Sequence, residues 1–189
     1  MKTNADRLEE VVVMFPETKE VIDKLDMTGI EYRIGGSVAL YVQGSKRFPR
    51  DVDIMLTAEE HEKANIMFNL DVEAIVRDTV SMQKSSPVTS GSIDFLSNYK
   101  MIVNGKTYFN PPTQYVATEF ESREIRLIPA EKIIVIKLLT LREHHDDPND
   151  VRTLVSSQDF DFDLFWDMAD AHNAKEIVQE RLRLLNIHF

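Results

Sequence analysis

Thirteen residues separate a glycine-glycine-serine turn, Gly35-Gly36-Ser37, from an Asp-x-Asp pair, Asp51 and Asp53. Glycines allow backbone conformations that other residues resist and let a ligand approach closely, and the N–H groups at the start of a helix bind anions. Two carboxylates on one face of a strand repel each other unless a cation lies between them. Mg²⁺ suits that place, because it prefers oxygen ligands and shares phosphate oxygens. The two features together predict a phosphate site beside a metal site, which is the minimum for chemistry on a nucleoside triphosphate.

The residues around this pattern predict the elements that would position it. We expect a strand over 30–34, a helix over 37–42 that ends before Gly44, and a second strand over 52–56. Taken separately, each feature also has a plain structural interpretation. Most such glycine turns are only turns, and an Asp-x-Asp pair at a strand start is often a solvated edge. The order strand, glycine turn, helix, strand favours the functional interpretation.

The segment from Tyr32 to Leu56 resembles the nucleotidyltransferase superfamily related to DNA polymerase beta. Within it, the chain is most similar to the bacterial abortive-infection toxin-like nucleotidyltransferases and the small domains grouped with them. These proteins carry a glycine-serine turn, an arginine shortly before the acidic pair, and then Asp-x-Asp. Arg47 lies four residues before Asp51, as that pattern requires, whereas Pro49 replaces the threonine that the family often has.

The resemblance implies a third carboxylate on a later strand, and Asp94 is the best match. It lies between Ile93 and Phe95 in an apolar run, where a charge is costly unless it is paired or bound to a metal. The alternative is an aspartate at a strand edge that faces water.

A second block of resemblance covers residues 128–154, where the family has a helix with a lysine, a following arginine, and then Asp-x-x-Asp. Here these are Lys137, Arg142, Asp147 and Asp150. Lys137 stands among isoleucines and leucines, so its ammonium group must either reach the surface or meet an anion. The resemblance favours a phosphate. Asp147 precedes Pro148, as an N-cap residue would, so we expect a structural role for the two acids.

The resemblance implies a metal-dependent transfer of a nucleoside monophosphate from a nucleoside triphosphate, such as ATP, to a hydroxyl acceptor. The acceptor can be an RNA end such as that of tRNA, a protein, or a small compound such as an aminoglycoside or lincosamide antibiotic. The toxin-like resemblance would imply an antitoxin partner. The alternative is a catalytically silent module that binds nucleotide or another protein. In the first case Mg²⁺, or Mn²⁺, is held by the catalytic residues Asp51, Asp53 and Asp94, and the nucleotide is bound by Gly35, Gly36, Ser37, Arg47 and Lys137.

Two further clusters have competing interpretations. The run His144-His145-Asp146-Asp147 offers metal ligands, but adjacent histidines on a helix do not face each other, so a zinc site is not expected. Aromatic residues gather at 160–166 beside acids. They fit either a helical interaction surface or core packing, and core packing is preferred.

Composition is that of an ordinary globular protein of 189 residues, with 43% hydrophobic and 29% charged residues. The net charge of −10 argues against broad nonspecific nucleic-acid binding. A local basic patch remains compatible with it, formed by Lys46, Arg47 and Arg50, and four further cations either line a cleft or are scattered on the surface: Lys100, Lys106, Arg123 and Arg126. The absence of cysteine excludes disulfides. The chain shows no signal-peptide pattern and no apolar run of membrane-spanning length, so we expect a cytoplasmic protein.

The patterning predicts an α/β (α+β) fold, and the resemblance implies a mixed-sheet nucleotidyltransferase core over residues 1–128 with a helical part packed on it over 129–189. Helices are expected over 5–28 with a break near Pro16, over 58–70 from a capping box at Thr57, and from Pro129 to the end. Strand patterns cover 91–97, 100–109 with an Asn104-Gly105 turn, and 114–128, while 71–90 is ambiguous. The last helix is expected around Ile177, Val178, Leu182 and Leu185.

Overall fold

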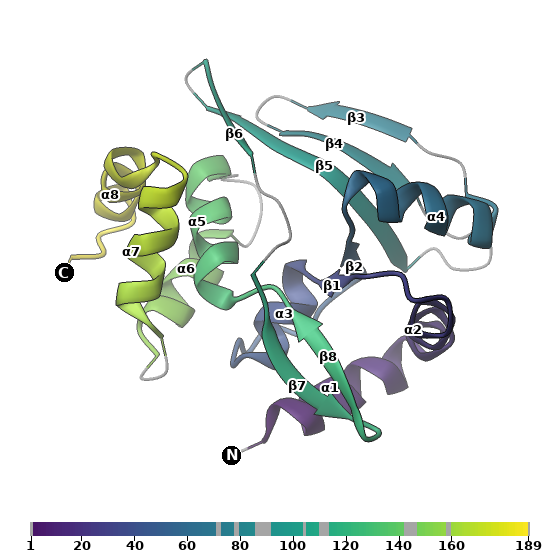
Figure 1. Ribbon diagram of the computed structural model, residues 1–189. Helices are drawn as coiled ribbons and strands as arrows, with labels where there is room; N and C mark the ends of the chain where they lie inside the picture. The colour runs from purple at the N-terminus through teal and green to yellow at the C-terminus, as the bar shows by residue number, and fades with distance from the viewer. Residues whose placement is uncertain are drawn as a thin grey trace.

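The computed structural model describes residues 2–70, 73–77, 80–85, 92–103, 105–109, 114–141, 147–157 and 160–188. They form a mixed eight-stranded sheet with helices packed around it (Figure 1). The strand order is β3-β4-β5-β2-β1-β8-β7, and β6 pairs with β5 off this path. The pairs β2–β5 and β1–β8 are parallel, whereas the others are antiparallel. The predicted α/β class with a mixed sheet is confirmed.

The helices are α1 (Asn4–Met14), α2 (Glu17–Thr28), α3 (Gly36–Val42), α4 (Ala58–Phe68), α5 (Ala130–Thr140), α6 (Asp147–Val155), α7 (Phe162–Ala171) and α8 (Lys175–Leu184). The strands are β1 (Arg33–Ile34), β2 (Val52–Met55), β3 (Glu73–Arg77), β4 (Val80–Ser85), β5 (Ile93–Val103), β6 (Lys106–Phe109), β7 (Val116–Phe120) and β8 (Arg123–Leu127).

The first half of the chain follows the predicted order of elements. The break at Pro16 separates α1 from α2, and α2 ends at Gly29 in the left-handed conformation. The predicted strand, helix and strand around the glycine turn are present, although β1 is only two residues long. Thr57 caps α4 by accepting a hydrogen bond from the Glu60 N–H, as predicted.

The strand predictions need three corrections. The ambiguous segment contains a hairpin of β3 and β4. The break expected between 97 and 100 is absent, because β5 runs unbroken from Ile93 to Val103, whereas β6 begins just after Gly105, in agreement with the predicted turn. The segment 114–128 is not one strand but a hairpin of β7 and β8. Its turn residues, Glu121 and Ser122, have φ of 49° and 63°. Because neither is glycine or asparagine, the usual turn signal is missing.

Alternation along the central strands defines a buried face of the sheet. Ile34, Ile54, Phe95 and Leu127 are all fully buried. Phe68 of α4 packs against Phe95 with the rings tilted and their centroids 5.2 Å apart, so α4 covers this face at β5. The residues between these positions point to the opposite face, which carries the predicted acidic side chains.

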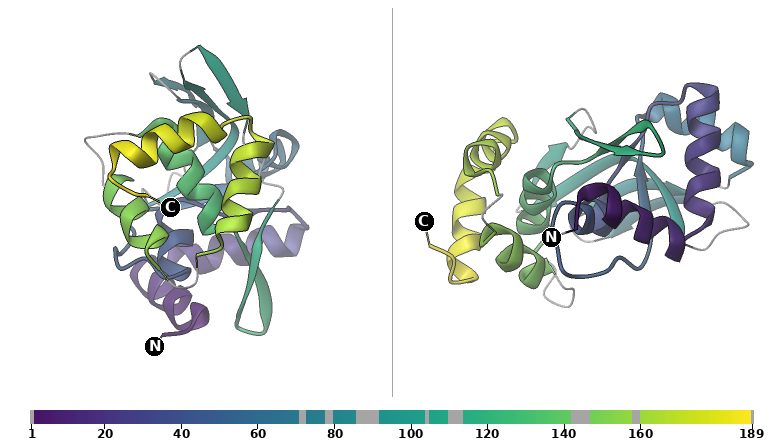
Figure 2. Two further views of the ribbon diagram at one scale, coloured as in Figure 1. Left: turned by 90° about the vertical axis from the view of Figure 1, so that its left-hand side faces the viewer. Right: turned by 90° about the horizontal axis from the view of Figure 1, so that it is seen from below.

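The four C-terminal helices gather at one end of the molecule, and α1 and α2 lie toward the other (Figure 2). The Gln43 side chain, just after α3, joins the two parts: its amide nitrogen donates to the Ile128 carbonyl at 2.8 Å, and its oxygen accepts from the Ala130 N–H at 3.0 Å. Phe160 and Phe165 are buried, which confirms core packing for the aromatic segment. No helix within the described residues is both long and apolar enough to cross a membrane.

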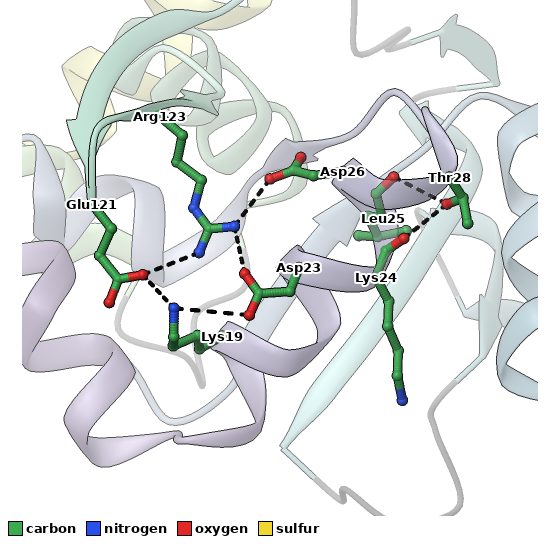
Figure 3. Close-up of polar contacts among 8 residues, drawn as sticks. All are labelled: Lys19, Asp23, Lys24, Leu25, Asp26, Thr28, Glu121 and Arg123. Atoms are coloured by element: carbon green, nitrogen blue, oxygen red, sulfur yellow. Dashed lines mark hydrogen bonds and ion pairs between the residues drawn. The ribbon is translucent and has the colours of Figure 1, made fainter.

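A charged cluster fixes the β7–β8 hairpin to α2 (Figure 3). Arg123 of β8 contacts Asp23 at 2.5 Å, Asp26 at 3.2 Å and Glu121 at 3.4 Å, and Lys19 pairs with Glu121. Arg123 therefore holds the hairpin against α2.

Candidate active site

The glycine turn and the acidic pair meet directly. Gly36 has a φ of +54°, and a β-carbon built on it would lie only 1.8 Å from Oδ2 of Asp53. A glycine is thus needed at this position for two reasons: the left-handed backbone and the close approach of a carboxylate. The sequence predicted that these features would lie together, and the structure brings them into contact.

The two glycines have different roles in this turn. The Gly35 N–H donates to the Asp53 carbonyl at 2.8 Å, so this group is engaged in the sheet and does not face a ligand. A β-carbon at Gly35 would lie 2.9 Å from Cγ of Met55, which makes its role steric. Gly36 and Ser37 open α3, which has no side-chain cap. Their N–H groups are the ones that a helix leaves without an internal acceptor.

Asp94 lies beside Asp53 on the neighbouring strand. The parallel register of β2 and β5 pairs Asp53 with Asp94 directly, so the two carboxylates emerge on the same face of the sheet. Asp94 is only 8% exposed, and Nζ of Lys84 in β4 lies 2.5 Å from its Oδ2. The apolar run around Asp94 thus contains a buried, paired charge and not a solvated edge.

Asp51 is half-buried at the bend before β2, two residues ahead of Asp53. The described residues contain no group of three or more His, Cys, Asp or Glu side chains that could hold a metal ion. The three predicted carboxylates therefore do not form a complete metal site by themselves. Magnesium in triphosphate sites commonly takes one or two carboxylates and completes its ligands from phosphate oxygens and water.

Lys137 and Arg47 take part in a second charged group. Lys137 of α5 is 8% exposed and pairs with Asp147 and, at 3.0 Å, with Asp150. Arg47 donates two hydrogen bonds to the Asp150 carboxylate, from Nε at 3.2 Å and from Nη2 at 2.6 Å. Asp147 and Asp150 are both buried in the first turn of α6.

This charge network bears on the predicted phosphate contacts. Lys137 does not reach the surface; it meets anions, as one interpretation required, but these anions belong to the protein. The structural role expected for Asp147 and Asp150 agrees with these ion pairs. Phosphate binding by Lys137 and Arg47 stays a prediction, and a phosphate would have to compete with two buried carboxylates.

Two further sequence predictions concern the run of candidate metal ligands after α5 and the basic patch. Arg142, His144, His145 and Asp146 lie outside the described residues. In the predicted basic patch, Lys46 and Arg50 are exposed, as are Lys100 and Lys106 in β5 and β6.

Lys84 was missed by the sequence reasoning. It stands in the ambiguous segment 71–90, whose strand character is weak. Its contact with Asp94 depends on the antiparallel pairing of β4 with β5, which places Lys84 opposite Leu96 and diagonally across from Asp94. Only the register of the two strands shows this pairing.

No family model and no curated protein matches this sequence. Solved structures do. One is a putative nucleotidyltransferase from Thermotoga maritima, with a TM-score of 0.58, 14% identity, and coverage of 75% of this chain and 92% of that one. Two others are antibiotic-modifying enzymes. The lincosamide antibiotic adenylyltransferase LnuA, bound to lincomycin, has a TM-score of 0.48 and 18% identity over 75% of this chain and 96% of that one. ANT(2'')-Ia, in complex with an adenylylated tobramycin, has a TM-score of 0.45 and 15% identity over 92% of this chain and 97% of that one.

The first of these matches bears on the architecture, because its TM-score exceeds 0.5 and the alignment covers most of both chains. The chain therefore shares its fold with this putative nucleotidyltransferase. At 14% identity this likeness establishes the fold alone, and the argument for activity rests on the residues of this chain.

Proposed function

We propose that this protein is a metal-dependent nucleotidyltransferase that moves a nucleoside monophosphate from a nucleoside triphosphate to a hydroxyl acceptor. The observation that carries the proposal is the contact of Gly36 with the Asp53 carboxylate, beside Asp94 on the adjoining strand. The fold supports it. In this proposal residues 1–128 form the catalytic core, and residues 129–189 form a helical part packed on it.

The donor set fits a hard divalent cation, Mg²⁺ or Mn²⁺. Asp51 and Asp53 would hold it, with Asp94 as a further ligand, and the outer phosphates would lie against the N–H groups of Gly36 and Ser37. The position beside Asp94 already attracts a cation, because the Lys84 ammonium group lies there. A divalent ion at this place would neutralise negative charge at the phosphorus under attack.

The chain's own residues then have separate roles. Asp94 accepts the proton of the attacking hydroxyl as its oxygen bonds to the α-phosphorus. The bond from that phosphorus to the bridging oxygen breaks, and pyrophosphate leaves with the electron pair. The turn at Gly36 and Ser37 orients the outer phosphates for an in-line attack. Positioning and electrostatics supply most of the rate in such a site.

One observation favours a second candidate function, a nucleotide-binding module without transfer. The ion pair between Lys84 and Asp94 occupies the carboxylate that a transferase needs as its base. In such a module Asp51 and Asp53 would still bind a metal–triphosphate complex, but Asp94 would serve only the packing of β4 on β5.

The acceptor classes stay those that the resemblance allowed: an RNA end, a protein or a small hydroxylated compound. An acidic protein attracts a cationic small molecule or a basic protein more readily than it attracts RNA. The toxin-like resemblance points instead to RNA and to an antitoxin partner.

A single experiment separates the two functions. The protein is incubated with each α-labelled nucleoside triphosphate and Mg²⁺ or Mn²⁺, in the presence of total RNA, a protein pool, or aminoglycosides and lincosamides in separate reactions. Label in an acceptor identifies the donor and the acceptor class together. Binding of triphosphate without transfer to any pool supports the silent module, and loss of both binding and transfer contradicts both functions.

A further inference from the structure

The face of the sheet that carries the acidic residues continues past the glycine turn onto the strands β8 and β7. Gly35 lies next to Asp53, through its N–H bond to the Asp53 carbonyl. Ile128 lies next to Gly35, because its N–H donates to the Ile34 carbonyl at 2.8 Å and its Cγ1 is 3.7 Å from a β-carbon built on Gly35. Tyr115 follows beside Ile128, because Val116 pairs with Leu127.

A second row of residues across the same face of the sheet contains two arginines. Arg33 pairs with Met55 across β1 and β2, and the register of Ile34 with Leu127 sets Arg126 of β8 beside Arg33. Strand residues two apart share a face, so Arg33 lies on the face of Gly35, and Arg126 lies on that of Ile128. The central strands of Figure 1 show this order, from β2 through β1 and β8 to β7.

Tyr115 packs on both guanidinium groups. Cζ of Arg33 lies 5.0 Å from the centroid of the Tyr115 ring, and Cζ of Arg126 lies 4.9 Å from it. Arg33 is only 8% exposed, whereas Tyr115 is 42% exposed. The tyrosine is therefore the outer member of the group, and part of its ring remains open to a ligand.

The Arg33 side chain is incompletely satisfied for a buried group. Its Nη1 donates to the Tyr32 carbonyl at 2.9 Å, and its Nη2 lies 3.5 Å from Glu31, an exposed residue. Its Nε is buried with no hydrogen-bond partner in the described structure. Arg126 pairs with the exposed Glu124 at 2.9 Å. Exposed acids hold a guanidinium group only weakly, so both arginines can support a ligand with π-electrons or negative charge.

We infer that Tyr115, backed by Arg33 and Arg126, is the platform on which the base of the donor nucleoside triphosphate stacks. This inference rests on the proposed function. Adjacent strands lie about 4.8 Å apart, so the columns of Asp53 and Tyr115 are separated by roughly 14 Å, and the ring leans back over β8 and β1 to reach both arginines. With the triphosphate at Gly36 and Asp53, the nucleoside extends across Gly35 and Ile128 toward this ring. Asp94 lies on the other side of the turn, which leaves that side to the acceptor.

The proposed stacking also explains why residue 115 is aromatic. Every base has a π-face, so a tyrosine platform binds the nucleoside without reading its hydrogen-bonding edge. The two guanidinium groups against the ring restrict its orientation, so little side-chain entropy is lost when the base binds. A site of this kind contributes to the affinity for nucleoside triphosphates but not for inorganic tripolyphosphate, which has no base.

Calorimetry with two probes tests the inference. The tightest-binding of the four ribonucleoside triphosphates and inorganic tripolyphosphate are each titrated, with Mg²⁺, into the wild-type protein, Tyr115→Ala and Tyr115→Phe. We expect the alanine variant to bind the nucleotide about tenfold or more weakly, the scale of base–aromatic stacking. Its affinity for tripolyphosphate should be unchanged, and the phenylalanine variant should match wild type for both probes.

Other outcomes have distinct meanings. Equal nucleotide affinity in wild type and Tyr115→Ala overturns the platform while leaving the proposed function intact, and so does an equal loss for both probes. A wild-type protein that binds neither probe overturns the proposed function, and the platform with it. If the alanine variant does not fold, Tyr115→Leu keeps apolar cover over the arginines and lacks the aromatic face, so the same selective loss is expected of it.

Discussion

The Oδ2 atom of Asp53 lies 1.8 Å from the point where a β-carbon on Gly36 would stand. The two residues are seventeen positions apart in sequence, yet neither can change size without moving the other. This contact ties the conformation of the phosphate-binding turn to the position of a metal-binding carboxylate. A change at the turn therefore acts on both halves of the proposed site.

Gly36→Ala should lower the affinity for Mg²⁺–triphosphate by about tenfold or more, because the new methyl group displaces the Asp53 carboxylate. The left-handed backbone adds a further strain of roughly 1–2 kcal/mol. Gly29→Ala is the matched control. Gly29 also has a positive φ, of +69°, but nothing lies within 4 Å of its β-carbon position. The control should lose the stability that backbone strain costs and keep wild-type affinity in calorimetry. Unchanged affinity in a folded Gly36→Ala protein would speak against a phosphate site at this turn.

Lys137→Met should destabilise the protein in the absence of any nucleotide. Removing one member of a buried ion pair leaves a buried charge poorly compensated, at a cost of about 3–5 kcal/mol. Here the affected carboxylates are Asp147 and Asp150, which are both buried. Lys24→Met is the control, because the ion pair of Lys24 with Glu20 is exposed and should contribute about 1 kcal/mol or less. Urea unfolding of the two variants measures the difference.

The same Lys137 variant tests the predicted phosphate contact. If the lysine acts only through Asp147 and Asp150, the folded fraction should bind triphosphate with near wild-type affinity. A selective loss of triphosphate affinity, with little change in the free energy of unfolding, would instead support direct contact with phosphate.

The glycine turn and the acidic residues could be located from sequence because their chemistry is local. A turn needs glycine, and an acid in an apolar run needs a cation, wherever the strand lies. Register is not local. The pairing of Lys84 with Asp94 depends on how β4 aligns with β5, and no short-range signal specifies that alignment.

The β7–β8 hairpin was missed for a similar reason. Glu121 and Ser122 adopt positive φ although neither is glycine or asparagine. Their turn is held by the ion pairs of Lys19 with Glu121 and of Arg123 with Asp23, which join it to α2. Tertiary contacts override local preference here.

The partners of Lys137 could be predicted only in part. The sequence indicated that the lysine must meet an anion, but it could not distinguish a bound phosphate from a carboxylate of α6.

The stability of the protein should fall between about pH 7 and pH 5.5, in part through His61. This residue is buried between two serines, with Nδ1 2.5 Å from Ser97 and Nε2 2.6 Å from Ser85. Burial holds the pKa of His61 below its usual value of 6.5. In this range the unfolded chain thus binds more protons than the folded one, and acid favours unfolding.

Chemical denaturation of wild type and His61→Gln over this pH range measures the effect. A single histidine contributes a slope of at most about 1.4 kcal/mol per pH unit. His172 also has a pKa lowered by burial, with a smaller effect of Lys132, so His172→Gln is the parallel variant. Each substitution should flatten the profile. Identical slopes in wild type and His61→Gln would show that His61 does not titrate differently in the two states.

Asp53→Asn and Asp94→Asn should separate binding from transfer. Asn keeps the size of Asp but loses its charge and its ability to accept a proton. Asp53 contacts the turn and would ligate the metal, so its variant should lose the Mg²⁺ dependence of triphosphate binding seen in calorimetry. Asp94 lies on the acceptor side, so its variant should keep much of the triphosphate affinity and lose transfer by roughly a hundredfold or more. Transfer at the wild-type rate in Asp94→Asn would remove Asp94 as the base. If the wild-type protein also transfers no label and only Asp53→Asn loses binding, the chain is a nucleotide-binding module, and the pairing of Lys84 with Asp94 is structural.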